Sequence, residues 1–211
     1  MSVLKKSVLL IALVLIVDQV VKFYIKTQMM LGDEIPVFGQ WFIIHFVENP
    51  GMAFGMQLGG KFGKVFLSIF RIVAIGGIGW YMVKLHRKQA PKGLIYCVAL
   101  VLAGALGNVI DSTFYGLIFD KGMVYDGELG RWFGYAGQAV LSTDGYAPVF
   151  QGCVVDMLHF RLFEGYYPGW FPFVGGDKFE FFRPVFNIAD SAITIGILSI
   201  LLFQKRFLTE H

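Results

Sequence analysis

The stretch Pro184-Val185-Phe186-Asn187-Ile188-Ala189-Asp190-Ser191-Ala192-Ile193-Thr194 opens an apolar run that continues to Phe203. At helical spacing Asn187, Asp190 and Thr194 fall on one face, and apolar residues cover the rest. An ionisable group inside a membrane-length helix is costly, so Asp190 is a candidate functional residue. The alternative is an interfacial carboxylate that stabilises the helix N-terminus. The stretch therefore predicts a membrane helix with polar groups near its start.

The composition is that of a polytopic membrane protein. Of the 211 residues 56% are hydrophobic and 16% are charged, which is too apolar for a water-soluble domain of this size. Four runs are long enough for a hydrocarbon core of about 30 Å, which needs about 20 residues. We expect a single membrane domain, residues 1–211, with helices over 7–25, 63–83, 93–111 and 185–203 and outer segments over 26–62 and 112–184.

The positions of the basic residues predict the orientation. They are Lys5 and Lys6 before the first helix, Lys84, Arg87, Lys88 and Lys92 between the second and third, and Lys205 and Arg206 after the fourth. Because basic residues accumulate in cytoplasmic loops, both termini are expected in the cytoplasm. The net charge of +3 reflects this topology and gives no indication of nucleic-acid binding.

The cysteines and histidines predict neither a disulfide nor a metal centre. Cys97 lies in the third helix and Cys153 in the second outer segment, so a bridge between them is not expected. The histidines, His45, His86, His159 and His211, have no ligand spacing, and the sequence contains no His-Glu-x-x-His, Gly-x-Ser-x-Gly or phosphate-binding glycine loop. We therefore expect chemistry without a metal or cofactor.

The outer segments contain strand-like sequence. Residues 35–56 are dense in β-branched and aromatic side chains and predict two short strands, followed by a turn at Asn49-Pro50-Gly51. Residues 153–160 predict a further strand, interrupted by Asp156. An acid in such an apolar run is either an outward-facing strand residue or a functional carboxylate.

Two other predicted helices contain charged residues within their apolar runs. Asp18 and Lys22 lie four residues apart late in the first helix and share a face. They form either a self-neutralising structural pair, with Lys22 reaching towards the surface, or a pair that positions substrate. Arg71, in the second helix, needs a partner, a water path or a route to the surface.

The topology predicts that the polar residues of the helices converge. The first and third helices run outwards and the fourth runs inwards, so late residues of the former meet early residues of the latter. The residues expected at this outer level are Asp18, Lys22, Asn108, Asp111, Asn187 and Asp190, with Arg71 somewhat deeper. Polar residues with unrelated structural roles would instead be expected at different depths of the bilayer.

Two carboxyl groups in such a site can hydrolyse an amide. They cannot both ionise cheaply, so they share a proton, activate water as base and protonate the leaving amine as acid. Helix positions alone pair Asp190 with Asp111. An ion-coupled carrier using Asp18, Lys22 and Asp190, and a non-catalytic lipid-binding membrane chaperone, are the alternatives.

Five motifs in order resemble lipoprotein signal peptidase, also called signal peptidase II. They are Asp18-Gln19-x-x-Lys22, Asn49-x-Gly51-x-Ala53-Phe54, Gly104-Ala105-Leu106-Gly107-Asn108-x-x-Asp111, Val154-Val155-Asp156 and Phe186-Asn187-x-Ala189-Asp190-Ser191. Each motif alone is weak, but their order and their distribution over the helices agree with this family over most of the chain.

The resemblance implies an all-α membrane protein of four transmembrane helices with a small extracytoplasmic β-cradle and an extended outer loop region. It implies an aspartyl endopeptidase of the bacterial inner membrane, and we expect a monomer in contact with membrane lipid. The substrate would be a prolipoprotein, cut before its diacylglyceryl-modified cysteine.

The resemblance also assigns the site residues. The catalytic dyad at the outer leaflet would be Asp156 and Asp190, and the supporting residues would be Asp18, Lys22, Asn49, Asn108, Asp111 and Asn187. Of these, we expect Asn49, Asn108 and Asn187 to donate to the substrate backbone or the oxyanion.

The sequence departs from the family in two places. Ser112 stands where the family has an arginine, and we hypothesise that Arg71 takes over part of that role. The segments on either side of Asp156 are longer than is usual in the family, so Asp120 and Asp144 are kept as alternatives to it. The extra stretches, 119–150 and 163–182, are expected to fold over the outer surface as lid or membrane-resting elements.

Overall fold

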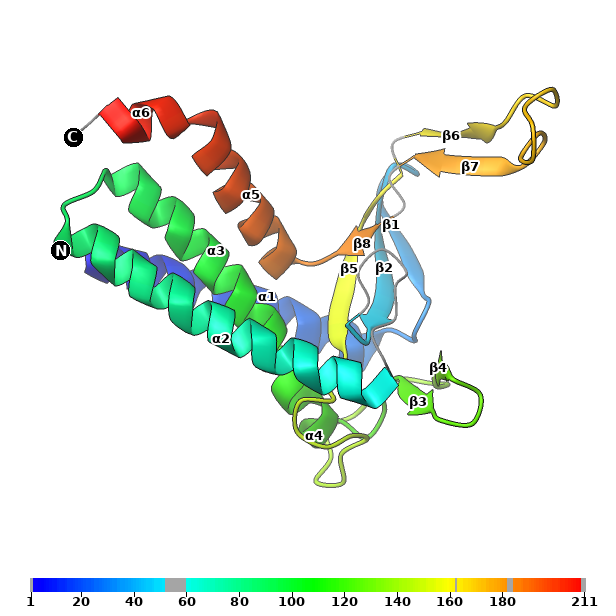
Figure 1. Cartoon of the computed structure of the whole chain (residues 1–211). Coiled ribbons are helices and arrows are strands. Elements are labelled where there is room, and N and C mark those ends of the chain that lie inside the picture. Colours follow the sequence, from blue (N-terminus) through cyan, green and yellow to red (C-terminus); the bar gives the residue numbers. More distant parts are fainter. Residues whose placement is uncertain (1, 52–59, 162, 182–183, 210–211) are drawn as a thin grey trace.

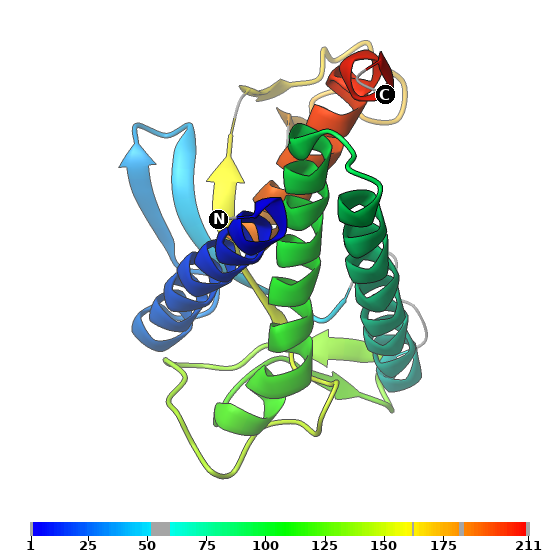
Figure 2. The same cartoon turned by 90° about the vertical axis from the view of Figure 1, so that its left-hand side faces the viewer.

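A central helix, α3 (Lys92–Ile110), contacts the three other long helices of the chain. The computed structural model describes residues 2–51, 60–161, 163–181 and 184–209. Helices α1 (Val3–Gln28) and α2 (Gly60–Arg87) flank α3 on either side, and α5 (Ile188–Leu202) packs across it (Figures 1 and 2). The chain is thus organised around α3.

Glycines on α3 allow this close approach. A Cβ at Gly104 would lie 2.1 Å from the carbonyl oxygen of Ala189 on α5. A Cβ at Gly107 would lie 2.8 Å from Oδ2 of Asp18 on α1 and 3.0 Å from the Cβ of Ala189. Only a residue without a side chain lets both neighbouring helices reach the α3 backbone at this level.

Three of the helical stretches are long and apolar enough to cross a membrane: Val3–Gln28, Gly63–Arg87 and Lys92–Ile118. The third includes a π-helical turn, η1 (Asp111–Tyr115), and a short helix, α4 (Gly116–Ile118), which continue α3. Helix α5 has 15 residues, which at 1.5 Å per residue gives about 22 Å. It is followed by the short helix α6 (Gln204–Thr209).

An antiparallel sheet lies beyond the ends of the helices (Figure 1). Its strands, in the order β1-β2-β5-β8, are β1 (Glu34–Phe38), β2 (Phe42–Asn49), β5 (Val154–Phe160) and β8 (Val185–Phe186). Two hairpins complete the outer segments: β3 (Val124–Asp126) with β4 (Arg131–Phe133), and β6 (Phe163–Tyr166) with β7 (Lys178–Phe181). The β6–β7 hairpin projects away from the helices, and its tip carries the exposed aromatic residues Trp170 and Phe173.

Two apolar cores hold these elements together. One lies where the sheet meets the helix ends and contains Ile25, Phe46, Tyr115, Phe119, Val155 and Met157, all almost fully buried. The other joins α2 to α3 near the opposite end and contains Met82, Leu85, Ile95, Val98 and Leu102. Apolar side chains such as Leu9, Ile16 and Val20 on the outside of α1 are exposed, as expected for a lipid-facing surface.

The predicted strands are confirmed, and the predicted helix boundaries differ by up to four residues, since α1 runs from Val3 to Gln28 and α2 from Gly60 to Arg87. β1 and β2 fall within 34–49 and β5 within 153–160, and the two cysteines are unbridged, as expected. The fourth helix, expected to begin at residue 185, begins at Ile188 because Val185 and Phe186 pair with His159 and Leu158 of β5. Residues 52–56 of the predicted strand region, with Ala53-Phe54 of the second motif, lie outside the described residues.

We expect Gly104→Ala to destabilise the protein. The new methyl group would overlap the backbone of Ala189 and the side chain of Ile193, both on α5. Overpacking of this kind costs about 1–3 kcal/mol. The matched control is Gly76→Ala on α2, where a Cβ would meet no atom within 4 Å. Thermal unfolding in detergent micelles measures both variants. Equal melting temperatures for the two would show that α3 and α5 do not pack as described.

Candidate active site

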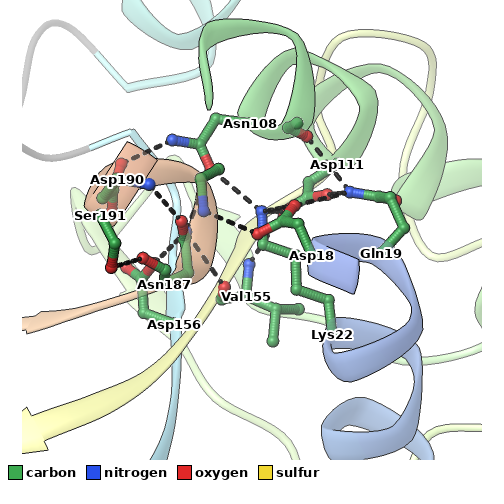
Figure 3. Close-up of polar contacts among 12 residues, drawn as sticks. Asp18, Gln19, Lys22, Asn108, Asp111, Val155, Asp156, Asn187, Asp190 and Ser191 are labelled. Carbon is green, nitrogen blue, oxygen red and sulfur yellow. Dashed lines mark hydrogen bonds and ion pairs between the residues drawn. The ribbon is translucent and has the colours of Figure 1, made fainter. Parts of the chain in front are cut away.

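A buried ion cluster centred on Lys22 joins α1 to the end of α3 (Figure 3). The Lys22 Nζ atom lies 2.9 Å from Asp18 Oδ2 and 2.7 Å from Asp111 Oδ2, and all three side chains are fully buried. Lys22 also donates to Asn108 Oδ1 at 3.0 Å. The Asp18–Lys22 pair is therefore confirmed, but Lys22 does not reach towards the surface.

Neutral donors satisfy the remaining carboxylate oxygens of this cluster. Gln19 Nε2 donates to Asp111 Oδ1 at 2.8 Å and to Asp18 Oδ2 at 3.1 Å. The backbone N–H of Ala189 donates to Asp18 Oδ1 at 2.9 Å, and that of Val155 donates to Asp111 Oδ2 at 3.4 Å. Because Ala189 lies in the first turn of α5 and Val155 belongs to β5, the cluster also fixes these two elements.

Two asparagines link the ion cluster to the other two carboxyl groups. Asn187 is the N-cap of α5, and its Oδ1 accepts from the backbone N–H of Asp190 at 2.9 Å. Its Nδ2 donates to Asp156 Oδ1 at 2.7 Å and to Asn108 Oδ1 at 3.0 Å. Asn108 Nδ2 in turn donates to Asp190 Oδ1 at 2.7 Å (Figure 3). The side chains of Asp156 and Asp190 are thereby held on one continuous amide bridge.

The two carboxyl groups differ in environment. Burial and the nearby Asp190 carboxylate raise the pKa of Asp156 to about 8, against the smaller opposing effects of Lys22 and Asn187. Asp190 is less buried and lines a groove of about 360 Å³ together with Phe186, Ser191 and Thr194. Asp190 also lies in the first turn of α5, where the helix dipole favours a negative charge. A buried carboxyl group with a raised pKa and a carboxyl group that opens onto the groove are therefore held by the same amide bridge.

Arg71 reaches this cluster from α2. Its Nη1 lies 3.5 Å from the Ser112 hydroxyl, which itself donates to the carbonyl oxygen of Asn108 at 2.9 Å. The guanidinium interacts electrostatically with Asp190, Asp156 and Asp111. A positive charge thus stands next to Ser112 and close to the three carboxyl groups.

The remaining candidates lie elsewhere. Asn49 ends β2 opposite Val154, and its Oδ1 accepts from the backbone N–H of Gly51 at 2.9 Å. Asp120 accepts from the backbone N–H of Val140 at 2.7 Å within the outer segment, and Asp144 is exposed. Helix positions alone pair Asp190 with Asp111; in the structure Asp111 is bound by Lys22 and Gln19, whereas Asp190 accepts from Asn108.

A second buried ion pair, Lys26 with Glu48, was not expected from the sequence. The Lys26 Nζ atom also donates to the carbonyl oxygen of Lys121 at 2.9 Å and lies 5.0 Å from the Phe119 ring centroid. Tyr135, whose pKa is raised by burial beside Glu48, donates to Glu48 Oε1 at 2.8 Å. The four-residue spacing from Lys22 to Lys26 is the signal that could have indicated it.

This second pair fastens the first extra outer stretch to α1 and β2. The contacts come from Phe119, Lys121 and Tyr135, which belong to the stretch 119–150 expected as a lid or membrane-resting element. The stretch is therefore docked against the end of the helices.

Comparison with known proteins gives consistent matches. The sequence model described as Signal peptidase (SPase) II matches residues 10–206. A lipoprotein signal peptidase of Porphyromonas gingivalis is 48% identical over 93% of this chain and 81% of its own length, and one of Amoebophilus asiaticus is 36% identical over 92% and 75%. A solved structure described as a bacterial membrane enzyme has a TM-score of 0.60 at 26% identity, over 98% of this chain and 91% of its own.

The apolar helical fold and these matches define a bacterial membrane peptidase of the aspartic type. The chain belongs to the signal peptidase II family. The ion-coupled carrier considered as an alternative finds no support in these relatives.

We expect Lys22→Met to destabilise the fold strongly. Removing the ammonium leaves Asp18 and Asp111 buried without their counter-ion, and breaking a buried ion pair in this way costs about 3–5 kcal/mol. Lys6→Met, at an exposed position of the same helix, is the control. Thermal unfolding in micelles compares the two. A melting temperature for Lys22→Met equal to that of the control would contradict a central role for the ammonium.

Proposed function

We propose that the chain cleaves prolipoproteins at the amide bond before the diacylglyceryl-modified cysteine, with Asp156 and Asp190 as the catalytic dyad. Removal of the signal peptide from prolipoproteins is the activity of its family. The observation that carries the assignment of the dyad is the amide bridge of Asn108 and Asn187, which holds one carboxyl group at each end.

The dyad would work through one water molecule. Asp190, as the accessible carboxylate, takes a proton from water while the oxygen attacks the scissile carbonyl carbon. Asp156, as the protonated acid, donates a hydrogen bond to the carbonyl oxygen as it becomes an oxyanion. When the C–N bond breaks, the proton taken up by Asp190 passes to the leaving amine, and neither step requires a metal.

The asparagines divide between two roles in this proposal. The amide nitrogens of Asn108 and Asn187 donate to the two carboxyl groups, so both residues position the dyad. This revises the expectation that they donate to the substrate. Asn49, at the end of the strand next to β5, is the remaining candidate for binding the substrate backbone or the oxyanion.

The groove beside Asp190 is the proposed place of the substrate. Its other walls are Pro184, Phe186, Ser191, Thr194 and Ile195, largely apolar groups suited to a signal peptide and the acyl chains of its cysteine. The sheet β1-β2-β5-β8 would form the cradle beneath it.

The proposed setting is the inner membrane, with α5 as a fourth span and the dyad at the outer leaflet. Asp18 and Lys22 come late in α1, Asp111 follows α3 and Asp190 opens α5, so one end of the bundle carries the whole site. Lys84 and Arg87 lie in the last turn of α2, Lys88 and Lys92 follow it, and Lys205 and Arg206 follow α5, which supports cytoplasmic termini. We propose a monomer, because both carboxyl groups come from one chain.

We expect Asp156→Asn and Asp190→Asn each to lower turnover of a lipid-modified precursor peptide by about a thousandfold, since loss of an acid or base costs about 10²–10⁴ in rate. Precursor binding should persist, because an amide is nearly isosteric with a carboxyl group. Asp144→Asn, at an exposed carboxylate, is the matched control. Peptide cleavage and fluorescence anisotropy give the two readouts. Normal cleavage by either dyad variant would remove that residue from the mechanism.

The same assay has an expected pH dependence. With its pKa near 8, Asp156 holds its proton below that pH and loses it above, so cleavage should decline as the pH rises through about 8. Because the raised pKa means that the folded state holds this proton more tightly than the unfolded chain, stability should fall progressively as the pH rises from the ordinary carboxyl value of 3.8 to about 8 and then level off. Melting temperatures at each pH therefore accompany the rates. A rate that rises steadily past pH 9 in folded protein would contradict a protonated Asp156.

Arg71→Ala should lower turnover by about tenfold or more, because it removes the positive charge beside the dyad. Adding Ser112→Arg to that variant should restore part of the lost activity, since it returns a guanidinium to the position where the family has one. Cleavage by the single and double variants is compared. Full activity of Arg71→Ala would end the idea that Arg71 compensates for Ser112.

A further inference from the structure

The sheet brings together three side chains that are far apart in the sequence. Glu34 of β1 is the Cα partner of His45 on β2, and His159 of β5 is the partner of Ile43, two residues before His45. Because side chains alternate along a strand, Ile43 and His45 point to one face of the sheet, and His159 joins them there. One carboxylate and two imidazoles from three neighbouring strands therefore share one face.

We infer that Glu34, His45 and His159 form a binding site for a divalent transition-metal ion of the Zn²⁺ class. One potential ligand atom of each residue lies within 4.8 Å of the other two. His45 Nδ1 is 3.5 Å from Glu34 Oε1, and the two imidazole centroids are 5.6 Å apart. This site is separate from the proposed hydrolysis, which needs no metal.

The donor set fits such an ion. Zinc binds imidazole nitrogen at about 2.0–2.1 Å and carboxylate oxygen at about 2.0–2.2 Å, which places tetrahedral ligand atoms about 3.3 Å apart. The ligand atoms, which lie within 4.8 Å of one another, must approach by up to about 1.5 Å to reach this spacing, and rotation of the Glu34 and His45 side chains can bring them together. Two imidazoles with one carboxylate leave a fourth position for water, and they favour zinc, copper or nickel over calcium or magnesium.

The different exposures of the three side chains would let a metal ion enter the site from the solvent side. His159 is 4% exposed and forms the inner wall of the site. The side chains of His45 and Glu34 are 24% and 38% exposed, so they can adjust to an arriving ion. The sheet itself need not open.

Arg161 competes with a metal for the carboxylate. Its Nη2 donates to Glu34 Oε1 at 2.5 Å, so the guanidinium must release that oxygen or leave the second one to the ion. The positive charge weakens the site electrostatically as well. Arg161 therefore sets the affinity below that of the three ligands alone.

The site would crosslink the strands that carry the proposed active site. His159 follows Asp156 by three residues on β5, so the two side chains lie on opposite faces of the strand. Asn49 ends the same strand that carries His45. A bound ion would fix β1, β2 and β5 to one another without touching the dyad.

The test is Zn²⁺ titration of the full chain, purified in micelles without a histidine tag and stripped with chelator. Calorimetry should give one bound ion per chain. His45→Ala and Glu34→Gln should each weaken binding by more than about tenfold, since loss of a supporting contact alone has that effect. His86→Ala, in the last turn of α2, is the matched control and should bind like the unmodified chain.

Two further readouts separate ligand loss from misfolding. Zn²⁺ should raise the melting temperature of the unmodified chain and of His86→Ala but not of Glu34→Gln. Arg161→Gln should bind Zn²⁺ more tightly than the unmodified chain, an effect that general damage to the sheet cannot produce. Equal Zn²⁺ affinity in the unmodified chain, His45→Ala and Glu34→Gln would overturn the site, as would weaker binding by Arg161→Gln.

Discussion

One ammonium group between two buried carboxylates holds this structure together at the level of its proposed active site. Lys22 contacts Asp18 on its own helix and Asp111 at the end of α3, where none of the three is exposed. Charges in such a place are tolerated only when they are paired and hydrogen-bonded. The donors that complete the pairing are Gln19 and the backbone N–H groups of α5 and β5, so the electrostatic requirement also fixes the relative positions of four elements. The glycines of α3 make this possible by admitting Asp18 and α5 to its backbone.

The proposed dyad depends on this cluster without belonging to it. Lys22 donates to Asn108, Asn108 accepts from Asn187, and these two amides hold Asp190 and Asp156. The two carboxyl groups have different surroundings. Burial and the nearby Asp190 carboxylate raise the pKa of Asp156 to about 8, whereas Asp190 lies on the groove at the start of a helix. In the proposed mechanism an acid and a base of the same residue type act together, because their surroundings differ.

The sheet contributes more than a support for Asp156. One face of β5 presents Asp156, and the other presents His159 to His45 and Glu34, so one strand serves both the proposed dyad and the inferred metal site. A separate buried pair, Lys26 with Glu48, fastens the extra outer stretch to α1 and β2. Arg71 stands beside Ser112 and brings a positive charge from α2 towards the carboxyl groups of the site. Charged residues from distant segments thus hold the outer stretch in place and surround the proposed dyad.

The sequence by itself determined the membrane class, the main strands and the residues that gather at the site. Apolar runs, helical spacing and family motifs are local properties, and they indicated Asp18, Lys22, Asn108, Asp111, Asn187 and Asp190 correctly as one cluster. Only the tertiary structure decided how these residues pair. It assigned Asp111 to Lys22 and moved the start of α5 to Ile188, because Val185 and Phe186 hydrogen-bond to a strand distant in the sequence. It also placed the ring of His45 next to that of His159, which is far away in the sequence. Such contacts depend on strand register and helix crossing, which are set by packing between distant segments and leave no periodic pattern in the chain.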